Sequence, residues 1–391
     1  MTGPASDASL LERVRSSLAA ESGPPTPARV AAVLRNHGAV LGDSAVLAVT
    51  EQVSSEISGA GPLDLLLRER GVTDVLVNGP DDVWVDRGDG LERAQIHLRD
   101  EAAIRRLAQR LATTAGRRLD DAVPFVDAVL PGGVRLHAVL PPISPAGTLI
   151  SLRVPAAQSF GLAELISSGG VPPELAPVLV AIVRSKVAFL VTGGTGSGKT
   201  TVLGALLGAV DPRDRIVLVE DSAELRPAHP HVVRLAARAA NVEGVGRVGL
   251  DDLVRQALRM RPDRLVVGEV RGSEVVDLLA ALNTGHEGGC GTLHANSAAD
   301  VPARLEALGV AAGLRRDAVH AQAVAALDVV VHLVRDRSGH RRVASVDLLS
   351  RSAAGDLVVV PGVTVGADGI VARGTGAAAL DTLVAEVAAA E

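Results

Sequence analysis

Short apolar runs alternate with amphipathic stretches along the second half of the chain. Four runs have the length and composition of buried strands: Val187–Thr192, Ile216–Glu220, Leu265–Glu269 and Gly291–His294. Stretches with helical spacing lie between them: the segment that ends at Ala209, then Asp251–Met260 and Ser273–Leu282. Because successive parallel strands need a crossover, this alternation predicts an α/β domain over residues 166–391. From about residue 300 we expect two helices, an antiparallel pair (Asp328–Val334 and Arg342–Leu349) and a terminal helix near Ala377–Ala390.

The segment 61–153 has a different pattern, which predicts a smaller α+β domain. Its expected strands are Val72–Val77, Val83–Asp86, Ala128–Leu130, Val134–Leu140 and Thr148–Arg153. Asp100 is the expected N-cap of a helix that buries Ile104, Leu107, Ala108 and Leu111 and ends at Gly116. We expect a linker over residues 154–165. Residues 1–60 form a helical extension, with helices near residues 10–18, Ala28–Arg35 and Ser44–Ile57.

Composition narrows the class of protein. Hydrophobic residues make up 47% of the 391 positions and charged residues 21%, which is a normal globular balance. The net charge of −6 and the lack of tyrosine, with three phenylalanines and one tryptophan, argue against binding to nucleic acid. The lone Cys290 excludes an intrachain disulfide and fits a reducing compartment. No apolar run reaches the ~18 residues of a membrane span, so we expect a cytoplasmic location, with peripheral attachment to the membrane left open.

One glycine-rich loop has the full G-x-x-x-x-G-K-[ST] pattern and lies between a predicted strand and a predicted helix. It consists of Gly193, Gly194, Thr195, Gly196, Ser197, Gly198, Lys199 and Thr200. Glycines let backbone N–H groups converge on a β-phosphate, the lysine reaches the β- and γ-phosphates, and the threonine hydroxyl binds Mg²⁺. The alternative is a glycine-rich turn that matches by chance. Lys186 and Lys199 are the only lysines among 39 basic residues, so one of the two lies in this loop.

Carboxylates follow two of the predicted parallel strands, where a P-loop enzyme needs them. Glu220 and Asp221 end the first of these strands, with Glu224 close behind, and Glu269 ends the second, before Arg271. One carboxylate would help to hold Mg²⁺ and another would polarise the attacking water. Both could instead be solvated strand ends, and the sequence leaves open which of Glu220 and Glu269 is the base.

The segment Thr284–Ser297 is dense in glycine and ends a strand with His294. This histidine could sense a γ-phosphate, or it could be an ordinary hydrogen-bonded structural group. Cys290 is interpreted as a small residue in a tight loop. Arg234 and Arg238 could reach the nucleotide of a neighbouring subunit as arginine fingers, or they could be exposed to solvent.

Together these motifs resemble the type II/type IV secretion traffic ATPases, in the branch of conjugation-like and tight-adherence (Tad/Flp) pilus systems. The resemblance covers roughly residues 60–350. It rests on the ordered set of Gly193–Thr201, the acidic box Val219–Leu225, the Walker B block Leu258–Gly272 and the histidine box Thr284–Ser297. In the first domain it rests on Val72–Gly79, Gly133–His137 with Pro141-Pro142, and Leu149–Arg153.

The resemblance implies a RecA-like P-loop NTPase motor domain behind a smaller N-terminal domain, assembled as a homo-hexamer with nucleotide between the two domains. Lys199, Thr200 and the rest of the loop through Thr201 would bind ATP and Mg²⁺. Glu220 and Glu269 would share the base and Mg²⁺ roles, and His294 would be the γ-phosphate sensor. Arg135 and Arg153 would contact the nucleotide from the N-terminal capping domain. Arg234 and Arg238 match the family's arginine-bearing loop and would be arginine fingers. The family has larger and hydroxyl residues at Gly289-Cys290-Gly291, so we expect a more flexible loop here.

Three functions remain to be compared. The first is an ATP-hydrolysing motor at the inner face of the membrane, which drives pilus assembly or secretion through an inner-membrane platform protein. The second is a nucleic-acid motor of RecA type or a conjugal DNA-transfer ATPase. The third is a nucleotide-binding scaffold without catalysis, which the intact acidic boxes oppose.

Overall fold

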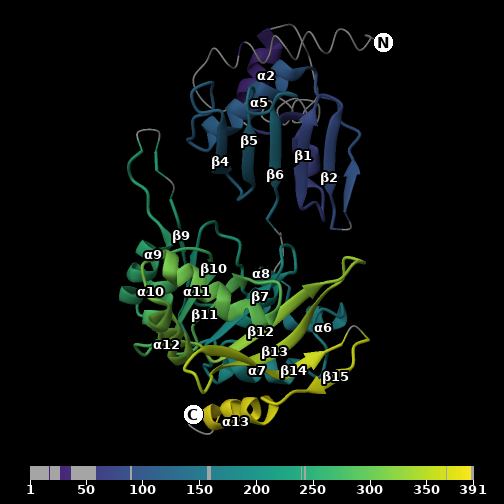
Figure 1. Cartoon of the computed structure of the whole chain (residues 1–391). Helices are drawn as coiled ribbons and strands as arrows, with labels where there is room; N and C mark the ends of the chain where they lie inside the picture. Colours follow the sequence, from purple (N-terminus) through teal and green to yellow (C-terminus); the bar gives the residue numbers. More distant parts are fainter. Residues whose placement is uncertain are drawn as a thin grey trace. The chain divides into compact units, whose positions relative to one another are not determined.

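A computed structural model of the chain describes residues 17, 27–36, 59–88, 90–155, 160–238, 240–241, 244–366 and 368–388 (Figure 1). The chain divides into two compact units, residues 1–156 and 157–391, and each is described by itself. Helix α2 (Pro27–Asn36) lies where the helix near Ala28–Arg35 was predicted. Of the helix expected near residues 10–18, Ser17 is described and is helical. The helix expected over Ser44–Ile57 and residues 156–159 of the expected linker lie outside the described residues.

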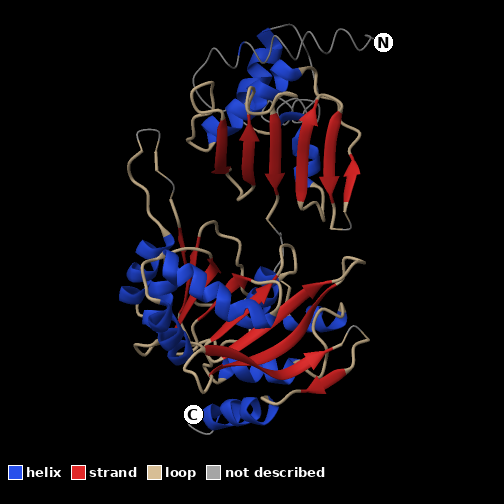
Figure 2. Cartoon of the chain, viewed as in Figure 1, coloured by secondary structure: helices blue, strands red, loops and turns tan. Residues whose placement is uncertain are grey.

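The first unit contains one antiparallel sheet of six strands, in the order β3-β2-β1-β6-β5-β4 (Figure 2). The strands are β1 (Asp74–Gly79), β2 (Asp82–Asp86), β3 (Leu91–Arg93), β4 (Phe125–Val129), β5 (Arg135–Val139) and β6 (Leu149–Arg153). A 3₁₀ turn (Gly61–Leu63) and α4 (Asp64–Arg68) precede the sheet. The strand predicted at Ala128–Leu130 is wrong in its bounds. It begins at Phe125, because Phe125 to Val129 pair in full with Val139 to Arg135.

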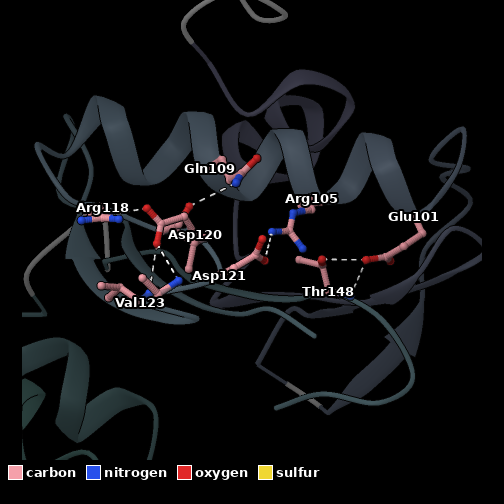
Figure 3. Close-up of polar contacts among 10 residues, drawn as sticks. Glu101, Arg105, Gln109, Arg118, Asp120, Asp121, Val123 and Thr148 are labelled. Carbon is pink, nitrogen blue, oxygen red and sulfur yellow. Dashed lines mark hydrogen bonds and ion pairs between the residues drawn. The ribbon is translucent and has the colours of Figure 1, made fainter. Parts of the chain in front are cut away.

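Helix α5 (Glu101–Thr114) covers one face of this sheet, as its pattern predicted. Asp100 accepts a hydrogen bond from the Ala103 N–H at 2.7 Å, which caps the helix. The four predicted core residues of the helix pack with the inward side chains of β1, β2, β5 and β6. Polar contacts join the first residue and the middle of the helix to neighbouring loops (Figure 3). Glu101 accepts hydrogen bonds from the N–H and hydroxyl of Thr148 at 2.8 and 2.7 Å, and Gln109 donates to the Leu119 carbonyl at 3.2 Å.

The second unit contains a mixed sheet of nine strands, in the order β15-β14-β13-β12-β7-β11-β10-β8-β9. Strands β12, β7, β11, β10, β8 and β9 are mutually parallel, and β13 to β15 continue the sheet in antiparallel fashion. The strands are β7 (Phe189–Gly193), β8 (Ile216–Glu220), β9 (Val232–Ala236), β10 (Arg264–Val270), β11 (Cys290–His294), β12 (Val329–Arg335), β13 (Arg341–Arg351), β14 (Leu357–Val365) and β15 (Val371–Arg373).

Helices cover both faces of this sheet, which explains the continuous apolar runs of its strands. On β7, Phe189 and Val191 belong to one core and Leu190 to the other. The first core contains α6 (Leu162–Ser167), α7 (Ala176–Arg184), α8 (Lys199–Leu207) and α13 (Ala377–Ala388). The second contains α9 (Leu250–Ala257), the 3₁₀ turn Leu258–Met260, α10 (Glu274–Leu282), α11 (Val301–Ala311) and α12 (Arg316–Ala326). A further 3₁₀ turn, Ala298–Asp300, leads into α11.

The predicted alternation and the antiparallel pair β12–β13 are confirmed, with small shifts at element ends. The helix expected to run to Ala209 ends at Leu207, and the one expected over Asp251–Met260 divides at Ala257 into α9 and a 3₁₀ turn. The sequence pattern did not predict β9, β14 and β15. β15 and β9 are the two edge strands of the sheet, and β14 lies next to β15 with a Pro-Gly pair in its middle, which interrupts its apolar run.

Candidate active site

The glycine-rich loop joins the carboxyl end of β7 to the start of α8. Gly193, Gly196 and Gly198 all have positive φ angles, of 153°, 69° and 93°. A Cβ at Gly193 would lie 2.5 Å from Ser197 Oγ and 2.6 Å from the Leu333 carbonyl oxygen, so only glycine fits there. Helix α8 begins at Lys199, so the loop presents its backbone N–H groups at a helix N-terminus. This is a phosphate-binding geometry.

Lys199 is half-buried within this loop, and its ammonium group donates to the carbonyl oxygens of Gly193 and Gly194, both at 3.0 Å. Burial lowers the pKa of Lys199, and the nearby Glu269 carboxylate acts in the opposite direction. The Ser197 hydroxyl is buried, and no described residue forms a hydrogen bond with it. Lys199 and Glu269 therefore lie close enough to act on the same ligand.

Glu220 and Glu269 lie at the carboxyl ends of neighbouring parallel strands, as predicted. The register pairs Val219 of β8 with Val267 of β10. Glu220 is only 3% exposed, and its Oε1 accepts hydrogen bonds from the Glu224 and Leu225 N–H groups at 3.0 and 2.8 Å. Its Oε2 is buried and has no hydrogen-bond partner among the residues that the structure describes. Burial raises the pKa of Glu220 above its ordinary value, so this carboxylate has an oxygen and a basicity suited to proton transfer.

The glycine of the Gly-Glu motif makes room for this carboxylate. A Cβ at Gly268 would lie 2.7 Å from Glu220 Cγ. Glu269 itself is 38% exposed and pairs with Arg271 at 3.1 Å. Arg271 also pairs with Asp221 at 2.8 Å, so it links the acidic box after β8 to the end of β10.

A magnesium ion fits the oxygen groups of this site. The described part of the chain contains no cluster of three or more His, Cys, Asp or Glu side chains that could enclose a metal by themselves. Mg²⁺ takes few protein ligands and completes its shell with phosphate oxygens and water. The Thr200 hydroxyl at the start of α8 and the Glu269 carboxylate are hard oxygen donors of the kind that Mg²⁺ prefers.

Two histidines flank β7 at the level of the loop. His294 ends β11 and lies in register with Gly193, and across the described residues its ring has no hydrogen-bond partner. His332 of β12 lies in register with Thr192, which was not predicted. It is 5% exposed, and its ring hydrogen-bonds the Thr192 hydroxyl at 2.9 Å and the backbone of Asn296. A single polar residue inside the run Val-Val-Val-His-Leu-Val was the signal that could have revealed it.

The arginines predicted as fingers make contacts within their own chain. Arg234 of β9 donates to the Leu225 carbonyl at 3.3 Å and lowers the pKa of Glu220 through its charge. Arg238 donates to the Gly246 carbonyl at 2.8 Å. A contact with a neighbouring subunit stays a prediction for both.

Arg135 and Arg153 lie in the first unit, in register on β5 and β6. Arg153 pairs with Asp74 at 2.9 Å. Their contact with nucleotide stays a prediction.

The interpretation of Cys290 as a small residue in a tight loop is wrong, and the structure gives no loop at Cys290-Gly291 for the expected flexibility. Cys290 begins β11 and is 1% exposed, and burial raises the pKa of its thiol to about 12. A Cβ at Gly289 would lie 2.3 Å from Leu282 Cδ2, and one at Gly291 would lie 2.7 Å from the Val267 carbonyl oxygen. The small residues allow β11 to pack closely against β10 and α10.

With the loop, the two carboxylates and His294 grouped in this way, the chain can be compared with known proteins. Residues 56–364 match the type II/IV secretion system protein family. The chain belongs to this family. Its relatives include conjugal transfer and secretion proteins, as the motifs had indicated.

Three relatives are informative. A protein of Mycobacterium tuberculosis, whose name assigns it provisionally to conjugal transfer, is 58% identical over 327 residues, which cover 82% of this chain and 93% of the relative. The conjugal transfer protein TrbB of Rhizobium radiobacter is 31% identical over 288 residues, 71% of this chain and 84% of TrbB. The type IV secretion system protein PtlH of Bordetella pertussis is 37% identical over 256 residues, 59% of this chain and 75% of PtlH.

Solved structures agree on the fold. The pilus retraction motor PilT with bound ADP is similar with a TM-score of 0.54 and 23% identity, over 75% of this chain and 83% of PilT. The ATPase DotB of Yersinia pseudotuberculosis has a TM-score of 0.50 and 17% identity, over 83% of this chain and 82% of DotB. The predicted fold class is therefore confirmed: a RecA-like P-loop domain follows a smaller N-terminal α+β domain. None of the described helices has the length and apolar character to cross a membrane.

Proposed function

We propose that this member of the type II/IV secretion family is a Mg²⁺-dependent ATPase. One observation supports the proposal above all. Lys199, Glu269, Glu220 and His294 come from four different elements and gather at the carboxyl ends of β7, β8, β10 and β11, where a bound triphosphate would lie. A scaffold that only bound nucleotide would have no need for a buried carboxylate with an unpartnered oxygen.

The groups take separate roles in this proposal. Gly193 to Thr201 and Lys199 hold the phosphates, and Mg²⁺ bound by Thr200 and Glu269 would neutralise charge on the phosphate oxygens. Glu220 accepts the proton of the attacking water at Oε2, since burial raises its pKa and its Oε1 is fixed by two backbone N–H groups. Glu269 pairs with Arg271 at 3.1 Å and lies close to the Lys199 ammonium group. His294 contacts the γ-phosphate with a ring that has no partner elsewhere in the described chain.

The second part of the proposal concerns the process that ATP hydrolysis drives. We infer a homo-hexamer at the inner face of the membrane that drives Tad/Flp-type pilus assembly or secretion through an inner-membrane platform protein. In such a ring, Arg135 and Arg153 of one domain, and Arg234 and Arg238 of a neighbouring subunit, would complete the nucleotide site. The proposal also divides the chain into an extension (1–60), an N-terminal domain (61–153), a linker (154–165) and an ATPase domain (166–391).

A conjugal DNA-transfer ATPase is the second candidate. The names of the relatives favour it, since TrbB and the mycobacterial protein are named for conjugal transfer. The net charge of −6 and the scarcity of aromatic residues argue that such a protein would act on other proteins of the transfer system rather than on DNA itself.

The two lysines of the chain provide a matched test. Lys199→Arg replaces a point charge that fits between phosphates with a planar fork that does not, whereas Lys186→Arg changes a residue whose ammonium lies 3.9 Å from Asp214, away from the loop. We expect Lys199→Arg to abolish Mg²⁺-ATP turnover and Lys186→Arg to retain it. Equal turnover in both variants would overturn the proposal. Turnover measured with and without single- and double-stranded DNA tests whether the protein acts on DNA, because strong stimulation by DNA would favour a nucleic-acid motor and contradict the argument from charge and composition.

A further inference from the structure

The β12–β13 hairpin places two arginines against the glycine-rich loop. Arg335 ends β12 and Arg341 begins β13, and the register pairs them directly across the hairpin. Arg341 Nε donates to the Gly196 carbonyl at 2.8 Å. A Cβ at Gly196 would lie 3.5 Å from Arg335 Nη1, and one at Gly198 would lie 3.7 Å from Arg341 Cδ. Both arginines therefore touch the loop from outside the predicted motifs.

This arginine pair lacks the carboxylates that surround the other arginines of the site. Arg271 pairs with two carboxylates, whereas the described residues give neither Arg335 nor Arg341 an ion pair. The nearest acidic residue in sequence, Asp336, spends its carboxylate within the hairpin turn, on the Ser338 and His340 N–H groups at 2.9 Å each. Like charges directly opposite one another on neighbouring strands are unfavourable. The pair thus has unused binding capacity beside the loop.

The sheet order places this pair on the side away from hydrolysis. β11, β10 and β8, with His294 and both carboxylates, lie on one side of β7, and the hairpin lies on the other. In the proposed function, the glycine-rich loop, Lys199, Thr200 and the carboxylates bind the triphosphate and its metal. Nothing among them accounts for the nucleoside. A guanidinium group has a flat face that stacks on an aromatic base.

We propose that the arginine pair forms the nucleoside wall of the ATP site, with the guanidinium faces of Arg335 and Arg341 against the base. Arg341 is the more firmly placed of the two, because its hydrogen bond to Gly196 ties the wall to the phosphate loop. This inference rests on the proposed ATPase function. It adds a determinant of nucleotide affinity that is separate from the phosphate-binding motif.

The test compares two ligands that differ only in the nucleoside. Calorimetric titration of the full chain with Mg²⁺-ATP and with Mg²⁺-tripolyphosphate gives the two dissociation constants. We expect Arg341→Ala to weaken ATP binding by about 3- to 30-fold, the range of one cation–π contact, while tripolyphosphate binding stays unchanged. We expect Arg335→Ala to weaken ATP binding by a smaller factor, again with no change in the binding of tripolyphosphate. Arg341→Lys behaves like Arg341→Ala, since an ammonium group keeps the charge but has no flat face.

Arg337→Ala is the matched control, because this arginine lies on the exposed turn of the same hairpin. We expect it to leave both dissociation constants unchanged. An equal loss of affinity for ATP and tripolyphosphate in Arg341→Ala would overturn the nucleoside assignment and leave the pair as a support of the phosphate loop. Unchanged binding of both ligands would overturn it as well. Failure of the wild-type chain to bind Mg²⁺-ATP would instead contradict the proposed function.

Discussion

Strand β7 has β11 on one side and β12 on the other, and each neighbour brings a histidine level with the start of the phosphate loop. His332 of β12 is buried and bonded on both sides, to the Thr192 hydroxyl and to the backbone of Asn296. His294 of β11 is half-buried, and its ring has no partner among the described residues. The two positions differ by one residue in the register, since His294 pairs with Gly193 and His332 with Thr192, so the two rings lie on opposite faces of the sheet. The surrounding protein satisfies the ring on one face and leaves the ring on the other face open.

The same contrast extends to the carboxylates. On the β11–β10–β8 side, Glu220 keeps a buried oxygen without a partner, which costs free energy unless a ligand or water uses it. Glu274, at the start of α10, is equally buried, and its Oε1 accepts from the Arg271 and Gly272 N–H groups at 2.6 and 2.7 Å. Buried polar groups that the fold satisfies are structural, and those that it leaves open indicate where the chemistry takes place.

The largest effect is expected from Glu220→Gln. An amide keeps the shape and can still accept a hydrogen bond at one oxygen, but it cannot take a proton from water, so turnover falls by about 100- to 10,000-fold while ATP binding remains. Steady-state phosphate release and calorimetric ATP binding measure the two properties. Glu274→Gln is the control, since it changes a glutamate of similar burial and backbone contacts. Comparable losses in both variants would break the contrast between them.

A smaller effect is expected from Arg271→Ala. This guanidinium holds Glu269 and Asp221 together, so its loss frees Glu269 and lowers turnover by about tenfold through misplacement of a charged group. Arg255→Ala removes a comparable set of ion pairs, between Arg255 and Asp251 on α9 and Asp277 on α10. Turnover in that control stays near the wild-type value. A greater loss for Arg255→Ala would show that general destabilisation explains both.

The smallest expected effect is the contribution of His332 to the pH dependence of the free energy of unfolding. Burial holds the pKa of His332 below its ordinary value of 6.5, so the unfolded chain binds a proton there before the folded chain does. The free energy of unfolding therefore falls as the pH drops below about 6.5, by at most about 1.4 kcal/mol per pH unit from this group, and is regained above it. His332→Asn removes this contribution. Urea unfolding at pH 7.5, 6.5 and 5.5 measures it, and parallel profiles for the two proteins would contradict it.

Local patterns in the sequence predicted the glycine-rich loop and the elements that flank it. The loop from Gly193, the strands that end at Glu220 and Glu269 and the cap at Asp100 depend on residues close together in the chain, so pattern and motif suffice. His332 and Arg341 could not be predicted in this way. Each acts through a neighbour more than 100 positions distant, and only the sheet order brings β12 and β13 beside β7.

For Glu220, too, only part of the environment could be predicted from the sequence, although the residue lies within a predicted motif. Its residue type and strand position were evident from the sequence. Its unpartnered Oε2 depends on how β10 packs beside β8, with Gly268 admitting the side chain. The proposal that Glu220 rather than Glu269 is the base therefore rests on the packed structure and not on the sequence.

The different roles of the histidines on the two sides of β7 are tested most directly by measuring turnover and the free energy of unfolding of two variants, His294→Asn and His332→Asn. We expect His294→Asn to lower turnover by about 10- to 100-fold, since it removes a contact to the transferring phosphate, and to change the free energy of unfolding by less than about 0.5 kcal/mol. We expect His332→Asn to lower the free energy of unfolding by about 1–3 kcal/mol and to keep turnover per folded molecule within a few-fold of wild type. Equal changes in both variants, or the reverse pattern, would contradict the division of roles across β7.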